Sequence, residues 1–346
     1  MKTITLFLSI ALLITACVKS GPEKQSETVS SSSNNSDMVT ILSDPDWIAM
    51  LNLVNNTIDV YDPDDANWND AGSKLMSWKP TTARGYSTAE VNAWGDVMDV
   101  KLRTLNGVDV WVTYAGGLVT TVTKSTGNKR WARIIGVSMA AHAVEVLPNG
   151  CVAVAGKNDN KVYLYSTTTS NYASFNLNVA RATLWDPLLN RLWVTGKIGT
   201  THVMTALIVG GTAASPTLSE DVSRRVTLPG CCGHDISPFY GDTNKLLVAE
   251  DKNYSFNKTT KVFTPLPSAI HNSMHVKSIG NLTNGQIVVL RADSFATPRP
   301  VPSCENFNSW SSCYAYFYSA TGALVASRYV SNNCFYKARV WNPNYQ

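Results

Sequence analysis

The sequence predicts an all-β protein, a single six-bladed β-propeller, and three observations lead to this fold class. A pattern of two short strands around a tight turn recurs at intervals of about forty residues, which is the spacing of propeller blades. The last copy of the pattern contains only a first strand, while the N-terminal part contains a hairpin that lacks one. Only 16% of the residues are charged, and the residues that favour strands and turns are plentiful.

Residues 141–156 show the repeated pattern most clearly. The polar residue His142 opens a first strand, alternating apolar residues follow, a Pro-Asn-Gly turn occupies positions 148–150, and a Val-rich second strand returns. The other copies begin at Asp99, Arg181, His234, His275 and Lys337. The Trp-Asn-Pro sequence at 341–343 in the last copy matches Trp-Asp-Pro at 185–187, which supports its interpretation as a first strand.

Residues 47–63 provide the hairpin that would complete the last copy. Their two apolar runs flank an Asn-Asn turn at 55–56, and nothing before them has the pattern of a first strand. A ring closed by strands from both ends of the chain has no exposed sheet edges. The sequence therefore predicts one propeller over residues 39–346, in which the C-terminal strand joins the N-terminal strands.

The first part of the chain has the pattern of an exported lipoprotein. An apolar run follows Lys2 and ends at Ile-Thr-Ala-Cys, which indicates a signal peptide over residues 1–16 and Cys17 as the lipidated first mature residue. An ordinary signal peptide with a chance cysteine is the alternative. Residues 17–38 are rich in Ser, Asn, Glu and Lys and predict a flexible tether. Val18 at the second mature position favours the outer membrane of the bacterial cell envelope.

Composition excludes several classes of partner. The formal net charge of +4 comes without a run of Lys or Arg, so we expect no nucleic-acid partner. No second apolar segment suggests a channel, and the lipid is the only expected membrane contact. Six blades use all of the remaining length of about 300 residues, so we expect one globular domain and a monomer.

The cysteines predict disulfides. Seven cysteines leave six after the predicted lipidation, and an exported protein folds in an oxidising setting. Cys304 and Cys313 flank one loop and are expected to pair. Cys231 and Cys232 are adjacent, and either they pair with each other or one of them bridges to Cys334. No Cys-x-x-Cys pair is present, which argues against structural zinc.

The polar residues that open the first strands define the candidate site. The first strand of each propeller blade lines the central channel, so its opening residue lies at the rim of one face. The residues that share this position include three of the five histidines and are His142, His234, His275, Arg181, Lys337 and Asp99. A polar residue before a strand is also common for structural reasons alone, which is the competing interpretation. Further candidates for the same face are Tyr336, His271 and Trp94.

A ring of imidazoles with a guanidinium and an ammonium suits an anionic sugar. β-Elimination at a uronate requires a cation that neutralises the carboxylate, a base of near-neutral pKa and an acid for the departing oxygen. The catalytic candidates are His142, His234, His275 and Tyr336. The substrate-binding candidates are Arg181, Lys337, Asp99, His271 and Trp94. Glycoside hydrolysis usually needs two opposed carboxylates, which the ring lacks.

Other functions compete with elimination. A divalent metal, Mn²⁺ or Zn²⁺, on His142, His234 and His275 would also neutralise a carboxylate, although the neighbouring Arg and Lys disfavour a cation. A non-catalytic glycan-binding surface lipoprotein needs the same basic funnel but no acid and base. A scaffold protein is the third alternative and predicts no clustering of the histidines. The expected partner is an acidic oligosaccharide or polysaccharide.

The chain resembles a family of secreted bacterial proteins that form six-bladed β-propellers of unknown function. The resemblance covers nearly the whole mature chain and rests on His-Ala-Val-Glu-Val-Leu-Pro-Asn-Gly at 142–150, Leu-Trp-Asp-Pro at 184–187, Gly-His-Asp-Ile-Ser-Pro-Phe-Tyr-Gly-Asp at 233–242 and His-Val-Lys-Ser-Ile at 275–279. It implies the fold and brings no established activity. Members often have His at the position of Arg181, so a His-rich metal site would lack one ligand here. By fold alone, the ring is similar to oligogalacturonate lyase, a propeller enzyme with a His-bound axial metal, but no linear motif of that enzyme is present.

Overall fold

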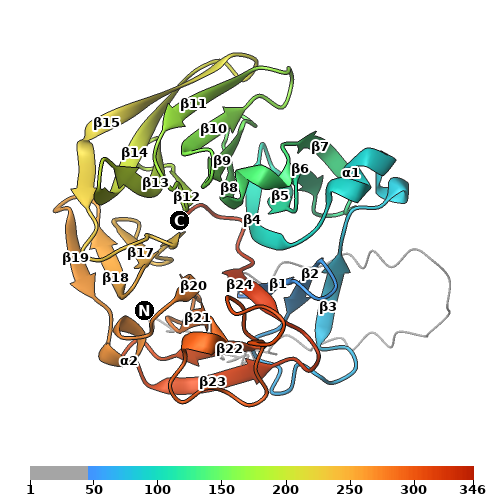
Figure 1. Ribbon diagram of the computed structural model, residues 1–346, viewed down its shortest axis with the longest axis vertical. Coiled ribbons are helices and arrows are strands. Elements are labelled where there is room, and N and C mark those ends of the chain that lie inside the picture. Colours follow the sequence, from blue (N-terminus) through green and yellow to red (C-terminus); the bar gives the residue numbers. More distant parts are fainter. Residues whose placement is uncertain (1–45) are drawn as a thin grey trace, which may run out of the picture. The chain divides into compact units, whose positions relative to one another are not determined.

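The computed structural model describes residues 46–346, which form a ring of six four-stranded antiparallel sheets (Figure 1). This is the predicted six-bladed β-propeller. The predicted signal peptide, the lipidation site Cys17, the tether and the predicted start at residue 39 lie outside the described residues. In the described part of the chain, no helix is long and apolar enough to cross a membrane.

The strand bounds follow sheet by sheet. The closing sheet contains β1 (Ile48–Asn52), β2 (Thr57–Tyr61), β3 (Lys74–Trp78) and β24 (Phe335–Val340). The next contains β4 (Val97–Leu105), β5 (Val108–Ala115), β6 (Leu118–Thr123) and β7 (Lys129–Ile134). The third contains β8 (Ala141–Val146), β9 (Val152–Gly156), β10 (Lys161–Tyr165) and β11 (Tyr172–Asn176).

The remaining three sheets follow the same plan. The fourth contains β12 (Thr183–Asp186), β13 (Arg191–Ile198), β14 (Thr201–Gly211) and β15 (Pro216–Thr227). The fifth contains β16 (Asp235–Pro238), β17 (Lys245–Ala249), β18 (Asn253–Asn257) and β19 (Val262–Pro265). The sixth contains β20 (Val276–Asn281), β21 (Ile287–Arg291), β22 (Tyr314–Tyr318) and β23 (Leu324–Tyr329). The short helices are α1 (Thr88–Ala93), α2 (Ser268–His271), η1 (Thr82–Arg84), η2 (Val137–Met139) and η3 (Asp293–Phe295).

The C-terminal strand closes the ring, as predicted. In each of the other five sheets the first strand in chain order lies nearest the axis, and β24 takes this place in the closing sheet (Figure 1). It pairs with β1 so that Val340 lies opposite Ile48. The backbone N–H of Trp341 also donates to the carbonyl oxygen of Trp47 at 2.6 Å. Strands from both ends of the described chain therefore hydrogen-bond to each other, so neither of them leaves an unpaired sheet edge at the closure.

Large aromatic side chains fill the space between neighbouring sheets. The indoles of Trp78, Trp111 and Trp341 are each at most 1% exposed. The ring centroid of Trp111 lies 5.6 Å from that of Trp78 and 5.6 Å from that of Trp341. Such contacts bury a large apolar area and bind one sheet to the next. They hold the start and the end of the propeller together, which fixes the positions of the inner strands.

The disulfide predicted between Cys304 and Cys313 is wrong. Cys304 instead pairs with Cys334, with the two Cα atoms 5.7 Å apart. An isolated β-bridge between Ser312 and Phe335 places the beginning of β24 beside this loop, which brings Cys334 to Cys304. Cys313 is a buried free thiol. The prediction failed because the pairing depends on a contact between distant segments of the chain, and the spacing of cysteines around a loop does not reveal such a contact.

Candidate functional site

A cavity of about 410 Å³ lies on the axis, at the end of the ring where the inner strands begin. Every sheet contributes a lining residue at or just before its innermost strand, and these residues are Met98, His142, Arg181, His234, Lys277 and Tyr336. Five of the predicted site residues therefore meet in this cavity, namely His142, His234, His275, Arg181 and Tyr336.

β-Bulges turn several of these side chains towards the cavity. The pairing of β4 with β5 shifts between Val97 and Asp99, so Met98 is an extra residue in its strand. The same shift occurs around His142 in β8 and around Lys277 in β20. An extra residue bends the strand, and its side chain no longer follows the regular alternation between the two faces of the sheet. The irregular starts of three inner strands thus build much of the cavity wall.

His142 is a buried and uncharged imidazole. Its Nδ1 lies 2.8 Å from the carbonyl oxygen of Ala140, so Nδ1–H donates to that oxygen and Nε2 remains an acceptor. Burial lowers the pKa of His142 to about 3, and the hydrogen bond to Ala140 offsets this only in part. The ring is therefore neutral at neutral pH.

His234 and Tyr336 lie beside His142. The ring centroid of His234 lies 5.7 Å from that of His142 and 6.2 Å from that of Tyr336. The Nε2 atom of His234 is 3.2 Å from the Nζ atom of Lys277. Burial, and then the charge of Lys277, lower the pKa of His234 well below its usual value. Burial raises the pKa of Tyr336, so its phenol keeps its proton at neutral pH.

His275 packs against aromatic side chains at the cavity. Its ring centroid lies 3.9 Å from that of Phe295 and 5.8 Å from that of Trp310. Within the described ranges, no group of three side chains at metal-binding distance contains a histidine. The ring nitrogens of His142, His234 and His275 are therefore not gathered at the distances of the Mn²⁺ or Zn²⁺ site considered from the sequence.

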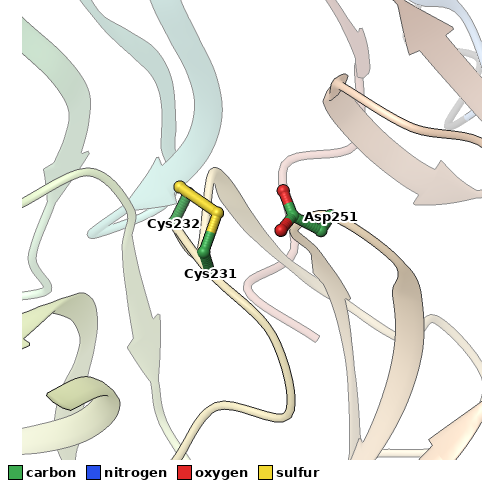
Figure 2. Close-up of side chains that lie close together, drawn as sticks. All are labelled: Cys231, Cys232 and Asp251. Carbon is green, nitrogen blue, oxygen red and sulfur yellow. A yellow bond between two sulfur atoms is a disulfide. The ribbon is translucent and has the colours of Figure 1, made fainter.

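Cys231, Cys232 and Asp251 form a different cluster on the cavity wall (Figure 2). The two cysteines pair with each other, which is one of the two pairings that the sequence left open. The sulfur atoms of a disulfide are not thiolates, and thiolates are the metal-binding form of cysteine. In this oxidised state the cluster contributes an apolar disulfide and one carboxylate to the wall.

Three cations line the cavity without an ion-pair partner among the described residues, namely Arg181, Lys157 and Lys277. The Nε atom of Arg181 is buried and has no hydrogen-bond partner in the described part of the chain. Lys277 is 2% exposed, and its Nζ lies 4.2 Å from the ring centroid of Trp310. Burial, and then the charge of Arg181, lower the pKa of Lys277 to about 7. Lys277 is not among the residues predicted from the sequence, because lysines also lie inside two other first strands, at Lys101 and Lys337.

Glu250 is a second group at the cavity that was not predicted from the sequence. It lines the cavity, is 2% exposed, and neither of its carboxylate oxygens has a hydrogen-bond partner among the described residues. Burial raises the pKa of Glu250 to about 8, and the nearby backbone N–H of Gly230 offsets this only in part. The side chain is therefore mostly uncharged at neutral pH. Asp96 and Asp251 are the other carboxylates of the lining.

Replacing Glu250 by glutamine is expected to stabilise the protein in alkaline but not in acidic solution. The folded-state pKa of Glu250 is about 8 and its ordinary value is 4.5, so its stabilising contribution is complete below 4.5 and is lost as the pH rises through 8. We expect Glu250→Gln to match the wild type near pH 4.5 and to be more stable by up to about 5 kcal/mol near pH 9. Urea denaturation at both pH values measures this, and a constant difference would contradict it.

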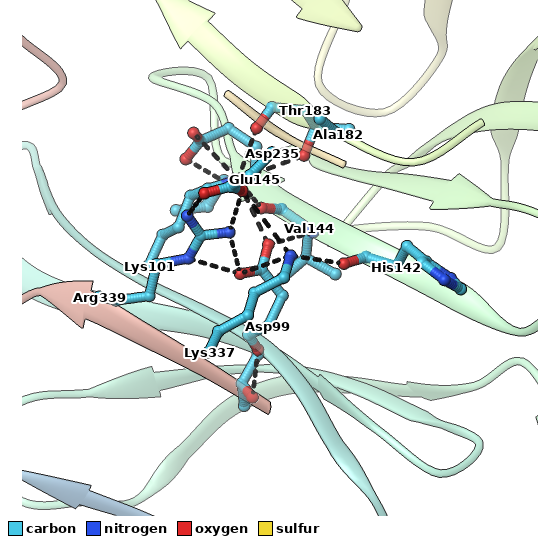
Figure 3. Close-up of polar contacts among 12 residues, drawn as sticks. Asp99, Lys101, His142, Val144, Glu145, Ala182, Thr183, Asp235, Lys337 and Arg339 are labelled. Carbon is cyan, nitrogen blue, oxygen red and sulfur yellow. Dashed lines mark hydrogen bonds and ion pairs between the residues drawn. The ribbon is translucent and has the colours of Figure 1, made fainter. Parts of the chain in front are cut away.

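Asp99 and Lys337 do not line the cavity, in contrast to the expectation from the sequence. They belong to the group of buried polar contacts drawn in Figure 3. Both are fully buried, and the Nζ of Lys337 donates to the carbonyl oxygen of His142 at 2.9 Å. The pairing of β24 with β1 is irregular at this point, and Tyr336 faces the cavity in place of Lys337. Figure 3 shows the carbonyl of His142 facing the buried charges while its ring points away from them.

His271 and Trp94 also lie outside the cavity lining. The Nδ1 of His271, at the end of α2, is 2.9 Å from the carbonyl oxygen of Asn253. The indole N–H of Trp94 donates to the carbonyl oxygen of Asn56 at 2.7 Å, and its ring packs against Trp78. Both side chains have structural contacts in these places. The tryptophan that lines the cavity is Trp310, which is 45% exposed.

Comparisons with known proteins show the fold. Neither a family model nor a curated protein sequence matches the chain. A protein of unknown function from Bacteroides caccae is 10% identical over 82% of this chain and 93% of its own, with a TM-score of 0.51. A chain of the nidogen/laminin complex is 7% identical over 84% of this chain and 97% of its own, with a TM-score of 0.55. Virginiamycin B lyase from Staphylococcus aureus is 13% identical over 80% and 78% of the two chains, with a TM-score of 0.46. At such identities the first two likenesses bear on the fold alone.

Proposed function

We propose that this protein is an exported lipoprotein whose axial cavity binds a uronate of an acidic oligosaccharide or polysaccharide and cleaves the sugar chain by β-elimination. The supporting observation is the set of three cations, Arg181, Lys157 and Lys277, that line one cavity without carboxylate partners among the described residues. The predicted lipid anchor would place this cavity in the cell envelope, where such polysaccharides are reached.

Unpaired cations in a cavity favour an anionic ligand. A buried charge without a partner destabilises the folded protein, and an anion that enters the site removes this cost. Arg181 offers a planar guanidinium whose two N–H groups match the two oxygens of a carboxylate. Trp310 offers an exposed indole on which the apolar face of a sugar ring can stack. Together these groups fit a carboxylate carried on a sugar.

Lys277 is better suited than the histidines to act as the base. Its pKa of about 7 leaves part of the amine unprotonated at neutral pH, whereas the pKa values of His142 and His234 make them weak bases. In the proposed step, the Lys277 amine takes the proton from the carbon beside the carboxylate. Tyr336 gives its proton to the glycosidic oxygen as that C–O bond breaks and the C=C bond forms. Lys277 thus takes the role that the sequence analysis gave to a histidine.

A binding and turnover panel tests the proposal. Uronate-containing oligosaccharides are compared with neutral oligosaccharides of the same length by calorimetry and by the ultraviolet absorbance of the unsaturated product. Arg181→Met should weaken binding of the uronates by about 10–100-fold, because a charge-assisted hydrogen-bond pair is lost. Arg133→Met is the matched control, since Arg133 packs on Tyr165 outside the cavity lining.

The outcomes separate the competing functions. Binding with an unsaturated product supports the lyase. Binding without any product supports the non-catalytic glycan-binding protein. If the wild-type protein neither binds nor cleaves an acidic glycan, or if Arg133→Met weakens binding as much as Arg181→Met, the proposed use of this cavity is wrong.

A further inference from the structure

We propose that Lys277 forms an imine with the carbonyl carbon of small 2-oxo acids, a class that includes open-chain keto forms of sugar acids. This reaction goes beyond the proposed elimination, because it needs a carbonyl group and no glycosidic bond. The 2-oxo acid would bind in the cavity on the propeller axis, and the atom that reacts with it is the Nζ of Lys277.

Lys277 differs from every other buried lysine in the described chain. The others each have a carboxylate nearby. Lys258 lies 2.8 Å from Asp186, and Lys101 and Lys337 lie 3.4 and 3.6 Å from Asp99. Lys124 likewise lies 3.5 Å from Asp109. A lysine that only supports the fold is expected to be paired in this way.

The surroundings of Lys277 favour the nucleophilic form of its amine. A desolvated lysine beside other cations loses its proton readily, and a neutral amine is a nucleophile towards carbonyl carbon. Burial and the nearby positive charges lower the pKa of Lys277 to about 7. The groups that contact or electrostatically affect its Nζ are His234, Trp310, Arg181, Lys157 and Lys337.

Imine formation at Lys277 needs proton transfers to and from its nitrogen. The Nζ lone pair attacks the carbonyl carbon, and the C=O electron pair moves to oxygen, which takes a proton. The nitrogen then loses a proton, the new hydroxyl group takes a second proton and leaves as water, and the nitrogen lone pair forms the C=N bond of a protonated imine. His234, whose Nε2 is 3.2 Å from Nζ, is the nearest ring nitrogen that can exchange a proton with the amine.

Charge selects the carbonyl compounds that bind. Arg181 and Lys157 line the same cavity and have no ion-pair partner among the described residues, so they are free to hold a carboxylate. A cavity of about 410 Å³ is large enough for a compound of three to six carbon atoms. A 2-oxo acid therefore fits better than a neutral ketone or aldehyde.

Reductive trapping tests the proposal on the full-length protein. The protein is incubated at neutral pH with pyruvate and cyanoborohydride, which reduces an imine to a stable secondary amine. Intact mass and peptide mapping then locate the adduct. We expect one reduced pyruvyl group per chain on Lys277, with labelling there at least tenfold above that of any other lysine. Acetone, which has no carboxylate, should label Lys277 at least tenfold more slowly.

Two variants make the result decisive. Lys277→Met should remove the adduct and should still fold, because no carboxylate loses a partner; its melting curve checks this. Lys252→Arg changes an exposed lysine outside the cavity lining and should label like the wild type. Absence of an adduct, labelling spread over surface lysines, or labelling that persists in Lys277→Met would overturn the proposal. Because pyruvate has no glycosidic bond, this outcome is independent of whether the protein cleaves uronates.

Discussion

Replacing Asp99 by alanine is expected to lower the free energy of unfolding by about 3–5 kcal/mol. Asp99 is fully buried at the axis, where it accepts hydrogen bonds from the Nε and Nη2 atoms of Arg339 at 2.9 and 2.7 Å and from the backbone N–H of Val144 at 3.1 Å. Its carboxylate also lies 3.4 Å from the Nζ of Lys101. Removing it leaves three buried cations, Arg339, Lys101 and Lys337, with less compensation in a low-dielectric interior.

An exposed ion pair provides the control for Asp99. Asp242 lies 2.8 Å from Lys245, and both side chains are more than a third exposed. Asp242→Ala should therefore cost only about 0–1 kcal/mol. Urea denaturation of the two variants and the wild type measures both values. Similar losses for Asp99→Ala and Asp242→Ala would show that the axial charges do not hold the inner strands together.

The same network makes the fold sensitive to strong acid. Burial alone would raise the pKa of Asp99, but the charges of Arg339, Lys337 and Lys101 lower it below its usual range. A carboxyl group with a lowered folded-state pKa contributes stability above its unfolded pKa, and this contribution is lost as the pH falls through the folded-state value. The axial network therefore supports the propeller fully at neutral pH and fails only in strongly acidic solution.

The architecture could be predicted because its signals are local and repeated. The turn at 148–150 and its counterparts mark each inner hairpin, and the Trp-Asn-Pro segment at 341–343 marks the C-terminal strand as a first strand. The positions of His142 and His234 in the repeat also bring them to one end of the axis. These features depend on alternation and turn chemistry, which the sequence shows directly.

The chemistry of the cavity could not be predicted as well, because it depends on local irregularities and on burial. Regular alternation places Lys337 at the rim, but the irregular pairing of β24 with β1 leaves Tyr336 there and Lys337 outside the cavity lining. A bulge likewise brings Lys277 to the cavity. The pKa of Glu250 depends first on the burial of its carboxyl group, which no spacing in the sequence reveals. Such features are typical of functional sites, where tertiary contacts rather than local sequence patterns determine the positions of the side chains.

Replacing Lys277 by methionine is expected to lower kcat for uronate elimination by about 10²–10⁴-fold, which is the usual contribution of a positioned base. Only the unprotonated amine can take the proton from the carbon beside the carboxylate. Because the pKa of Lys277 is about 7, the wild-type rate should rise with pH up to about 7 and then level off. Initial rates over this pH range, read from the absorbance of the unsaturated product, measure both effects.

Two further variants separate the base from its neighbours. Lys252→Met removes an exposed lysine outside the cavity lining and should leave kcat and KM unchanged. His234→Ala keeps the amine but admits water around it, because His234 is only 7% exposed and its Nε2 lies 3.2 Å from the Nζ of Lys277. Solvation favours the charged amine, so the midpoint of the pH profile should move to higher pH while the plateau rate is largely retained. If His234→Ala instead abolishes elimination at every pH and Lys277→Met does not, the base is the imidazole of His234, and the unpaired amine of Lys277 serves only to bind the carboxylate.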